Sequence, residues 1–495
     1  MSKEIVVVAR NTSIVFIAKI VSYFLAIVFN IIIARKFGAE IYGNYILIYS
    51  ILSIFSVLVT LGIKDGLMYY LPRLNADKNF EDNKNLTTTT LIVSFLLGLF
   101  VILLIFLLSK QLSLTVFDSI VYSKSFKILS FLIITDALTD LIRASLRSND
   151  EIKQYALGDI LLGIFRILII TIFIIIGLNE NVLFLCYVSA SAITLTYYLF
   201  IFKQKKLFGK VNKNSINLYK SMLLMFYPSM FTAILLLLQF KIDKIMIGAF
   251  LDDSSVGIYN IAITIANLSS FFFVVLNTIM SPLISKMYYE NNLEKLSEVY
   301  KTTTKWTSSI NLLFFALVLI LNREFLQVFG TEFRIGAITL ILVTVGQIIN
   351  SSTGSSSALI NMTGRVKINF YLNLIAVIIN ISLNIVLIPI YGINGAAFAT
   401  MISIIFLNSS SVIYIYTKMN LHPFSPQMVK QIIVISASLL FSYIFYIIIN
   451  LNWLGSIIII TFTMLLLYIS LNWIIGFDND DKLVFEKIKN RFSFL

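Results

Sequence analysis

Long apolar runs alternate with short polar gaps along the whole chain. A membrane-spanning helix needs roughly 20 mostly apolar residues, and fourteen runs in the sequence come near that length. No gap is long enough to hold a folded extramembrane domain. The pattern therefore predicts an all-α polytopic membrane protein with about 14 transmembrane helices. The predicted spans are residues 12–34, 45–63, 87–109, 125–147, 155–177, 181–202, 221–240, 255–281, 306–321, 335–360, 368–389, 392–417, 429–450 and 453–476.

Composition excludes several other classes of protein. Hydrophobic residues make up 58% of the 495 residues and charged residues 13%, whereas soluble domains have about 45–50% and about 25%. The single cysteine, Cys186, excludes an intrachain disulfide and a cysteine metal cluster. The single histidine, His422, excludes a multi-histidine centre. We therefore expect no cofactor and no resident metal.

The distribution of positive charge predicts the topology. The net charge is +13, but lysines of membrane proteins concentrate in cytoplasmic loops, so no nucleic-acid partner is expected. With the N-terminus inside, 26 lysines and arginines fall in predicted cytoplasmic segments, nine in outer segments and three within spans. This asymmetry predicts an even number of spans and places both termini in the cytoplasm.

The sequence divides into two halves with a short internal match. The most basic gap follows six predicted spans and is interpreted as a linker. IYGNY at 41–45 opens the second span, and SVGIY at 255–259 opens the eighth. Parallel repeats are common in secondary transporters, with the substrate path between them. The predicted domains are an N-terminal six-helix lobe (1–203), a basic cytoplasmic linker (204–220), a C-terminal six-helix lobe (221–417), and two extra helices with a cytoplasmic tail (418–495).

Four segments resemble the polysaccharide-transporter family, the flippases of oligosaccharide repeat units. They are ARKFGAEIYGNY (34–45), DKIMIGAFLDDSSVGIYNIA (243–262), GQIINSSTGSSSALINMTGRVK (346–367) and NIVLIPIYGINGAAFATMIS (384–403). The resemblance extends from about residue 10 to 420, and the IPxYGxxGAAxAT run at 388–400 is its most specific part. The superfamily also holds the lipid II flippases and the MATE drug antiporters.

This resemblance implies two six-helix lobes around a central cavity and two additional C-terminal helices. It also implies alternating access that moves a lipid-diphosphate-linked oligosaccharide from the cytoplasmic to the outer leaflet. The expected location is a bacterial or archaeal plasma membrane, where membrane lipids are partners. Coupling to protons or sodium, and contact with a glycan polymerase or glycosyltransferases, stay open.

Ionisable residues inside the predicted spans mark the candidate site. A charge at bilayer depth costs about 2.5–3.5 kcal/mol on insertion scales, so it normally faces a protein interior or a wet cavity. The six that lie deep in the spans are all in the first half: Lys19, Asp136, Asp140, Arg143, Asp159 and Arg166. At helical spacing, Lys19 shares a stripe with Ser22, Tyr23, Ala26 and Asn30, and Asp159 shares one with Gly163 and Arg166. The second half offers amides instead.

These residues receive provisional roles. The cavity cations proposed to bind the diphosphate are Lys19, Arg166, Arg143 and Arg35, the last matching the family's arginine after helix one. The ion-coupling candidates are Asp136, Asp159 and Asp243. The polar lining is expected from Asn30, Gln347, Asn373, Asn380 and Asn384. A purely structural reading competes. In it Arg143, Arg147 and Asp159 pair near the cytoplasmic ends of adjacent spans, and Asp136 pairs with Arg166. Asp243, Lys241 and Lys244 would then anchor the outer end of span seven.

Rival functions are weighed against the same residues. No G-x-x-x-x-G-K-[ST] loop is present, so ATP hydrolysis is not expected. A membrane glycosyltransferase or O-antigen polymerase would carry a large outer loop or an outer acidic pair. The only such pair, Asp252 and Asp253, is interpreted as solvated on a short turn. A MATE-type drug antiporter is expected to place a carboxylate where this chain has Lys19. We therefore predict a transporter, not an enzyme, and a lipid II flippase remains the nearest alternative.

Overall fold

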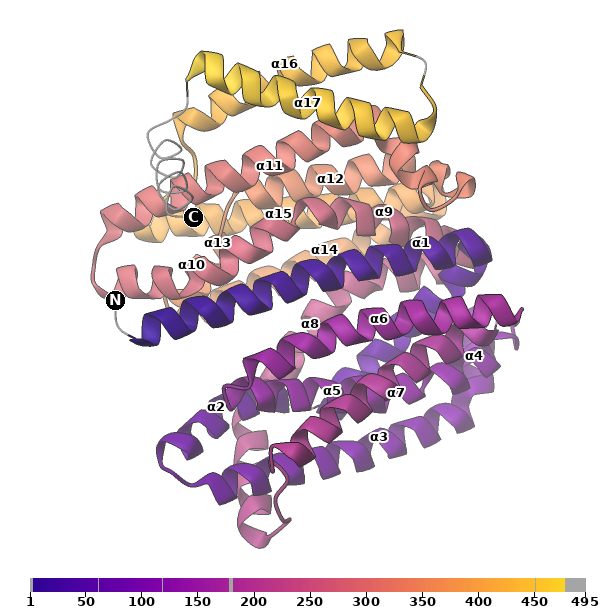
Figure 1. The fold of residues 1–495 in the computed structure, drawn as a ribbon, viewed down its shortest axis with the longest axis vertical. Coiled ribbons are helices and arrows are strands. Elements are labelled where there is room, and N and C mark those ends of the chain that lie inside the picture. The colour runs from indigo at the N-terminus through magenta and orange to yellow at the C-terminus, as the bar shows by residue number, and fades with distance from the viewer. Residues whose placement is uncertain (1–2, 61, 118, 178–180, 450, 477–495) are drawn as a thin grey trace. The chain divides into compact units, whose positions relative to one another are not determined.

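A computed structural model describes residues 3–60, 62–117, 119–177, 181–449 and 451–476. Within these ranges the regular structure is helical and contains no strand, which confirms the predicted all-α class. The helices are α1 (Lys3–Thr60), α2 (Ile63–Ala76), α3 (Phe80–Phe117), α4 (Tyr122–Leu129), α5 (Phe131–Ser148), α6 (Ile152–Ile176), α7 (Asn181–Gln204), α8 (Lys213–Phe250), α9 (Asp253–Ser269), α10 (Phe271–Tyr289), α11 (Leu293–Gln327), a 3-10 helix (Thr331–Gly336), α12 (Ala337–Ser352), α13 (Ser356–Met362), α14 (Val366–Tyr391), α15 (Ile393–Met419), α16 (Pro426–Ile448) and α17 (Trp453–Ile475) (Figure 1).

The chain forms two compact units, residues 1–257 and 258–495. In the first unit α1 packs against α6 and α8, while α5 packs against α2, α3 and α7. A buried apolar cluster that includes Leu67, Leu141, Ile142 and Phe202 holds α5 in place. Because α8 packs with the first unit, the unit boundary follows α8, and the six-plus-six lobe division stays a prediction.

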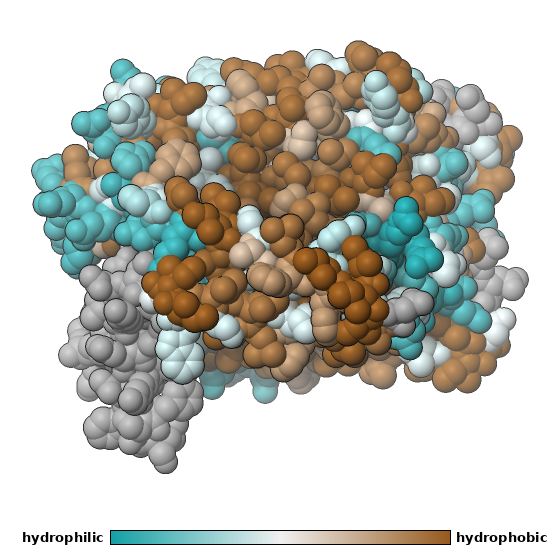
Figure 2. Space-filling model, turned by 90° about the horizontal axis from the view of Figure 1, so that it is seen from above, coloured by the Kyte–Doolittle hydropathy of each residue, from teal (hydrophilic) through white to brown (hydrophobic). Residues whose placement is uncertain are grey.

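In the second unit α15 packs against α12, α13 and α14, and α11 packs against α12, α16 and α17. Gln431 on α16 donates a hydrogen bond to Asn472 on α17 at 3.0 Å, and both side chains are buried. The outward faces of α16 and α17 are apolar: Phe441 is 59% exposed and Phe462 is 62% exposed. Figure 2, which shows the side of the molecule formed by α16 and α17, has a hydrophobic middle between hydrophilic ends. Such a surface suits contact with lipid, and the protein is a multi-pass membrane protein.

The predicted count of about fourteen spans is not confirmed. Among the described residues ten helices are long and apolar enough to cross a membrane, or twelve if each of two bent pairs is one span. Backbone breaks explain much of the difference. Residues 12–34 and 45–63, predicted as two spans, fall largely within α1, where Gly38 has φ 78° and interrupts the helix. Residues 125–147 are divided between α4 and α5 at Ser130.

Candidate functional site

A cavity of about 190 Å³ lies between α1 and α6 in the first unit. Its lining residues are Ser22, Ala26, Phe29, Asp159, Leu162, Gly163 and Arg166. The two helices approach closely, since a Cβ at Gly163 would lie 2.8 Å from Cβ of Leu25. The cavity therefore opens beside the small residues of the two stripes that the sequence marked as polar faces.

Arg166 is the cation of this cavity. Its guanidinium carbon lies 5.1 Å from the ring centroid of Tyr187 and 6.0 Å from that of Phe29. Tyr187 in turn stacks on Tyr45, with ring centroids 3.5 Å apart. A cation held against aromatic faces gains about 0.5–2 kcal/mol. In the described ranges Arg166 forms no ion pair within 4.0 Å, and its buried Nε has no hydrogen-bond partner. Arg166 thus keeps at least one buried donor without a partner among the described residues.

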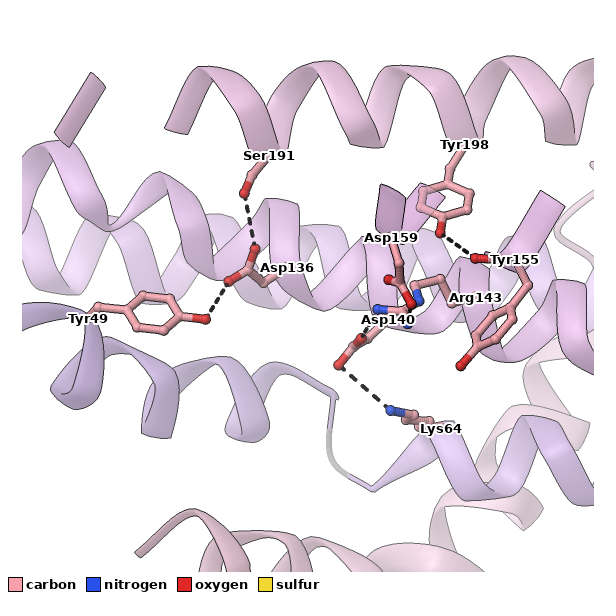
Figure 3. Close-up of polar contacts among 9 residues, drawn as sticks. All are labelled: Tyr49, Lys64, Asp136, Asp140, Arg143, Tyr155, Asp159, Ser191 and Tyr198. Atoms are coloured by element: carbon pink, nitrogen blue, oxygen red, sulfur yellow. Dashed lines mark hydrogen bonds and ion pairs between the residues drawn. The ribbon is translucent and has the colours of Figure 1, made fainter. Parts of the chain in front are cut away.

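Asp136 on α5 lies near this aromatic stack and is held by hydroxyl groups. The hydroxyl of Tyr49 donates to one carboxylate oxygen at 3.4 Å, and that of Ser191 donates to the other at 3.5 Å (Figure 3). The predicted direct pairing of Asp136 with Arg166 is wrong, because no ion pair within 4.0 Å joins them. The rings of Tyr45 and Tyr49 stack beside Asp136, with their centroids 5.7 Å apart.

Of the three residues grouped by the structural reading, Arg143 and Asp159 form an ion pair, whereas Arg147 forms none within 4.0 Å among the described residues. The Arg143 guanidinium donates to the Asp159 carboxylate at 2.8 Å, joining α5 to α6 (Figure 3). Arg143 also lies 3.8 Å from Asp140, which is 3.8 Å from Lys64 of α2. Arg143 thus faces two carboxylates within its own helix bundle, whereas Arg166 faces aromatic rings.

The remaining first-half candidates lie outside the cavity lining. Lys19 is exposed on α1 and close enough to Asp159 for electrostatic attraction. Arg35 is exposed near the break at Gly38. Asn30 accepts a hydrogen bond from the hydroxyl of Tyr42 at 3.3 Å. The cavity therefore brings together Arg166 and Asp159, but not all four proposed cations.

The amides of the second unit mostly bind one another and neighbouring hydroxyls. Gln347 donates to Asn267 at 3.1 Å and accepts from Ser270 at 2.6 Å. The buried Asn380 donates to Thr400 at 3.4 Å and accepts from the buried Asn384 at 3.1 Å. Asn373 donates to a carbonyl oxygen of its own helix, that of Asn369, at 2.7 Å. Hydrogen bonds of this kind join packed helices in many proteins, so they do not by themselves mark these amides as a substrate site.

Three charged residues lie elsewhere than the sequence indicated. Lys244 and Asp243 are only 8% and 3% exposed, so their assignment as outer anchors is wrong. The helix α8 continues to Phe250, beyond the span predicted to end at residue 240, and it packs against α1. Asp253 is also not simply solvated: it accepts hydrogen bonds from Asn44 at 3.1 Å and from the Tyr122 hydroxyl at 2.9 Å.

The glycines of the two matching fragments lie against each other's helices. A Cβ on Gly43 would overlap the carbonyl oxygen of Asp253, and one on Gly257 would overlap that of Ala39. Their common spacing in the sequence was visible, but the contact between them was not. The match therefore marks a close approach of α1 to residues 253–257 within the first unit.

Comparison with known proteins decides the family. The model of the polysaccharide biosynthesis protein family matches residues 8–288, which is more than half of the chain. The chain belongs to this family. The family indicated by the four sequence segments is thereby confirmed, and the MatE family model also matches residues 228–386. This second match agrees with membership in the superfamily of MATE-like exporters.

Curated relatives match parts of this polysaccharide biosynthesis family member. It is 28% identical over 165 residues to a probable low-salt glycan biosynthesis flippase of Haloferax volcanii, covering 32% of this chain and 34% of that protein. It is 26% identical over 268 residues to the capsular polysaccharide biosynthesis protein CapF of Staphylococcus aureus, covering 52% and 65%. The chain thus spans between about a third and two thirds of the length of these relatives.

Solved structures share the fold. The lipid II flippase MurJ in an inward closed conformation superposes with a TM-score of 0.72 at 17% identity, covering 93% of this chain and 98% of that one. An inward-facing multidrug resistance MATE family transporter gives 0.67 at 15% identity, covering 81% and 94%. At these sequence identities the likeness establishes the fold of this chain but not its substrate.

Proposed function

We propose that this polysaccharide biosynthesis family member is a transporter that moves a lipid-diphosphate-linked oligosaccharide from the cytoplasmic to the outer leaflet by alternating access. It acts without chemical conversion of its substrate. The observation that carries the proposal is Arg166, a cation in a cavity with aromatic neighbours and an Nε that has no hydrogen-bond partner. A diphosphate supplies compact negative charge and several strong acceptors, which match a guanidinium.

The other assigned residues complete this proposal. Lys19 and Arg35 meet the anionic head at the two mouths of the path, while Arg143 keeps the cavity wall in register through Asp159. The amides Asn30, Gln347, Asn373, Asn380 and Asn384 are proposed to face sugar hydroxyls when the helices rearrange. Among the carboxylates, Asp136, Asp159 and Asp243 are the proposed sites of proton or sodium coupling.

The proposed setting is the plasma membrane of a bacterium or archaeon, with both termini in the cytoplasm. The asymmetry of lysine and arginine supports that orientation. Membrane lipids surround the apolar faces, and the glycan polymerase or glycosyltransferases of the same pathway are the proposed protein partners.

A lipid II flippase is the second candidate. The superposition with the lipid II flippase structure, over 93% of this chain, is the observation that favours it. Both candidates carry a lipid diphosphate, so Arg166 fits either one. A cation-exporting drug antiporter fits this cavity less well, because its substrate would meet the Arg166 charge.

The test uses purified protein in liposomes with a fluorescent lipid-diphosphate oligosaccharide in both leaflets. An externally added, membrane-impermeant glycosidase digests outward-facing glycan. We expect nearly complete digestion with the protein and about half without it, the latter set by the random starting distribution. The same assay with labelled lipid II separates the two candidates. Digestion limited to the starting outer fraction for both lipids would contradict a flippase function.

A further inference from the structure

Residues 203–220, from the end of α7 to the first two turns of α8, carry a concentrated positive charge. The exposed lysines are Lys203, Lys206, Lys210, Lys213 and Lys220. The sequence has no aspartate or glutamate between residues 181 and 242. Lys205 pairs with Glu151 of the α5–α6 turn at 2.8 Å, and the nearby Asp82 accepts hydrogen bonds from Asn214 at 2.9 Å. Those acidic groups therefore already have partners, and the other lysines lie open to the surroundings.

The backbone beneath these lysines is fixed to α3. The amide of Gly209 donates to Thr88 at 2.8 Å, and that of Lys210 donates to the Asn85 side chain at 2.6 Å. A Cβ on Gly209 would overlap Asn85, so the close approach requires glycine there. The hydroxyl of Thr89 also donates to Ser215 in the first turn of α8 at 2.8 Å. The lysines thus project from a fixed backbone.

Exposed apolar side chains alternate with the lysines. Phe208 is 42% exposed, Val211 47% and Ile216 40%. Each lies within three residues of Lys210 or Lys213. A purely aqueous surface gains nothing from these side chains, whereas the boundary of headgroups and acyl chains accepts apolar groups between cations. The pattern matches the chemistry of a bilayer surface better than that of a soluble acidic protein.

We propose that residues 203–220, the basic linker surface, bind the anionic phospholipid headgroups of the membrane that contains the protein. The connection is short: α7 ends at Gln204 and α8 begins at Lys213, and both helices belong to candidate spans. The lysines therefore stay at juxtamembrane depth, where each contributes about fivefold to association with an anionic leaflet. The surface holds this part of the first unit against the leaflet.

The experiment measures lipid preference at the linker itself. A fluorophore is attached to Gln204→Cys in the full-length protein, since native Cys186 is buried and the unchanged protein gives the labelling background. The labelled protein is placed in phosphatidylcholine nanodiscs that contain equal fractions of nitroxide-labelled phosphatidylglycerol or phosphatidylcholine. We expect about twofold stronger quenching by phosphatidylglycerol at roughly 0.1 M salt, and a smaller difference at high salt.

A pair of triple variants distinguishes specific binding from general charge. Lys206→Gln, Lys210→Gln and Lys213→Gln together should abolish the preference. The matched triple removes Lys286, Lys295 and Lys301 around the α10–α11 turn, where exposed Glu290, Glu294 and Glu298 lie beside them, and should retain it. Equal quenching by the two lipids, or an unchanged preference in the linker triple, would overturn the proposal. Binding of a soluble acidic protein to the linker in nanodiscs of phosphatidylcholine alone, with no preference for phosphatidylglycerol, would also overturn it. None of these readouts depends on transport.

Discussion

The Arg143 guanidinium lies 2.8 Å from the Asp159 carboxylate and ties α5 to α6 in the first unit. Asp159 also lines the cavity that holds Arg166, which lies about two turns further along the same face of α6. The pair therefore connects the packed interior of α5 to the wall of the candidate site. Loss of this ion pair should therefore affect both the packing of α5 and the wall of the cavity.

The first prediction concerns this pair. Arg143→Gln should lower the free energy of unfolding by about 2–3 kcal/mol, because it leaves a half-buried carboxylate without its partner. Asp159→Asn should do the same. The double variant should lose less than the sum of the two. Thermal unfolding of purified protein in detergent measures all three, and strictly additive losses would show that the pair has no coupling energy.

A second prediction concerns the close approach of α1 to residues 253–257. Gly43→Ala and Gly257→Ala should each cost about 2 kcal/mol or more in stability, because the new methyl group meets a backbone carbonyl that cannot rotate away. Gly346→Ala is the matched helical control: its nearest neighbour is the flexible Ile404 side chain at 3.3 Å. Yields and melting temperatures of the three variants provide the measurement. A Gly43→Ala protein as stable as the Gly346→Ala protein would rule out this close approach.

Sequence reasoning located the cavity faces because helical periodicity is local. Ser22 and Ala26 on one predicted stripe and Asp159, Gly163 and Arg166 on the other all line the cavity. It did not locate the rings around Arg166. Tyr187 comes from α7, and its place over the guanidinium depends on how α6 and α7 pack, a tertiary relation that no spacing in one helix encodes.

Errors in helix boundaries account for the misplaced charges. Ending the seventh span at residue 240 put Lys244 at a membrane surface, whereas α8 continues through it and buries it. Breaks at a glycine and a serine caused a different error, in the number of predicted spans. Gly38 bends α1 and Ser130 separates α4 from α5, so hydrophobicity alone counted spans that the backbone divides differently. Hydropathy reports transfer to lipid and contains no term for such breaks.

A third prediction separates two roles of Asp136. If this carboxylate carries a coupling proton, Asp136→Asn should abolish gradient-driven transport while substrate still binds, because the amide keeps an acceptor for Tyr49. Tyr49→Phe is the control, since it removes the hydrogen bond but leaves the carboxylate. Transport into liposomes with and without an imposed pH gradient measures both. Gradient-driven transport at the unmodified rate in Asp136→Asn would exclude the coupling role.

A fourth prediction concerns topology and follows from the lysine and arginine distribution. A reporter fused after Leu495, which lies outside the described residues, should be cytoplasmic. One inserted between Leu451 and Trp453, before α17, should be external. Paired enzyme reporters, one active only inside and one only outside, measure each fusion. Both fusions on the same side would contradict the proposed orientation of α17.

The last prediction tests the anion site through Arg166 and Lys19. A cation in a membrane cavity is costly unless water, aromatic rings or a ligand stabilise it, and a bound diphosphate would add charge-assisted hydrogen bonds. Since such bonds are worth about 1.5–3 kcal/mol each, Arg166→Gln should lower flipping by roughly tenfold or more. Arg166→Lys should recover only part of the flipping activity, because an ammonium lacks the planar fork that faces Tyr187.

At the exposed Lys19, charge matters more than shape, so Lys19→Arg should retain more activity than Lys19→Gln. Lys36→Gln, another exposed lysine of α1, controls for loss of charge alone. Export of surface glycan in a strain that depends on this gene, with protein abundance measured in parallel, gives the readout. Wild-type export by both Arg166→Gln and Lys19→Gln would make these cations structural and would reopen the case for a neutral or cationic substrate.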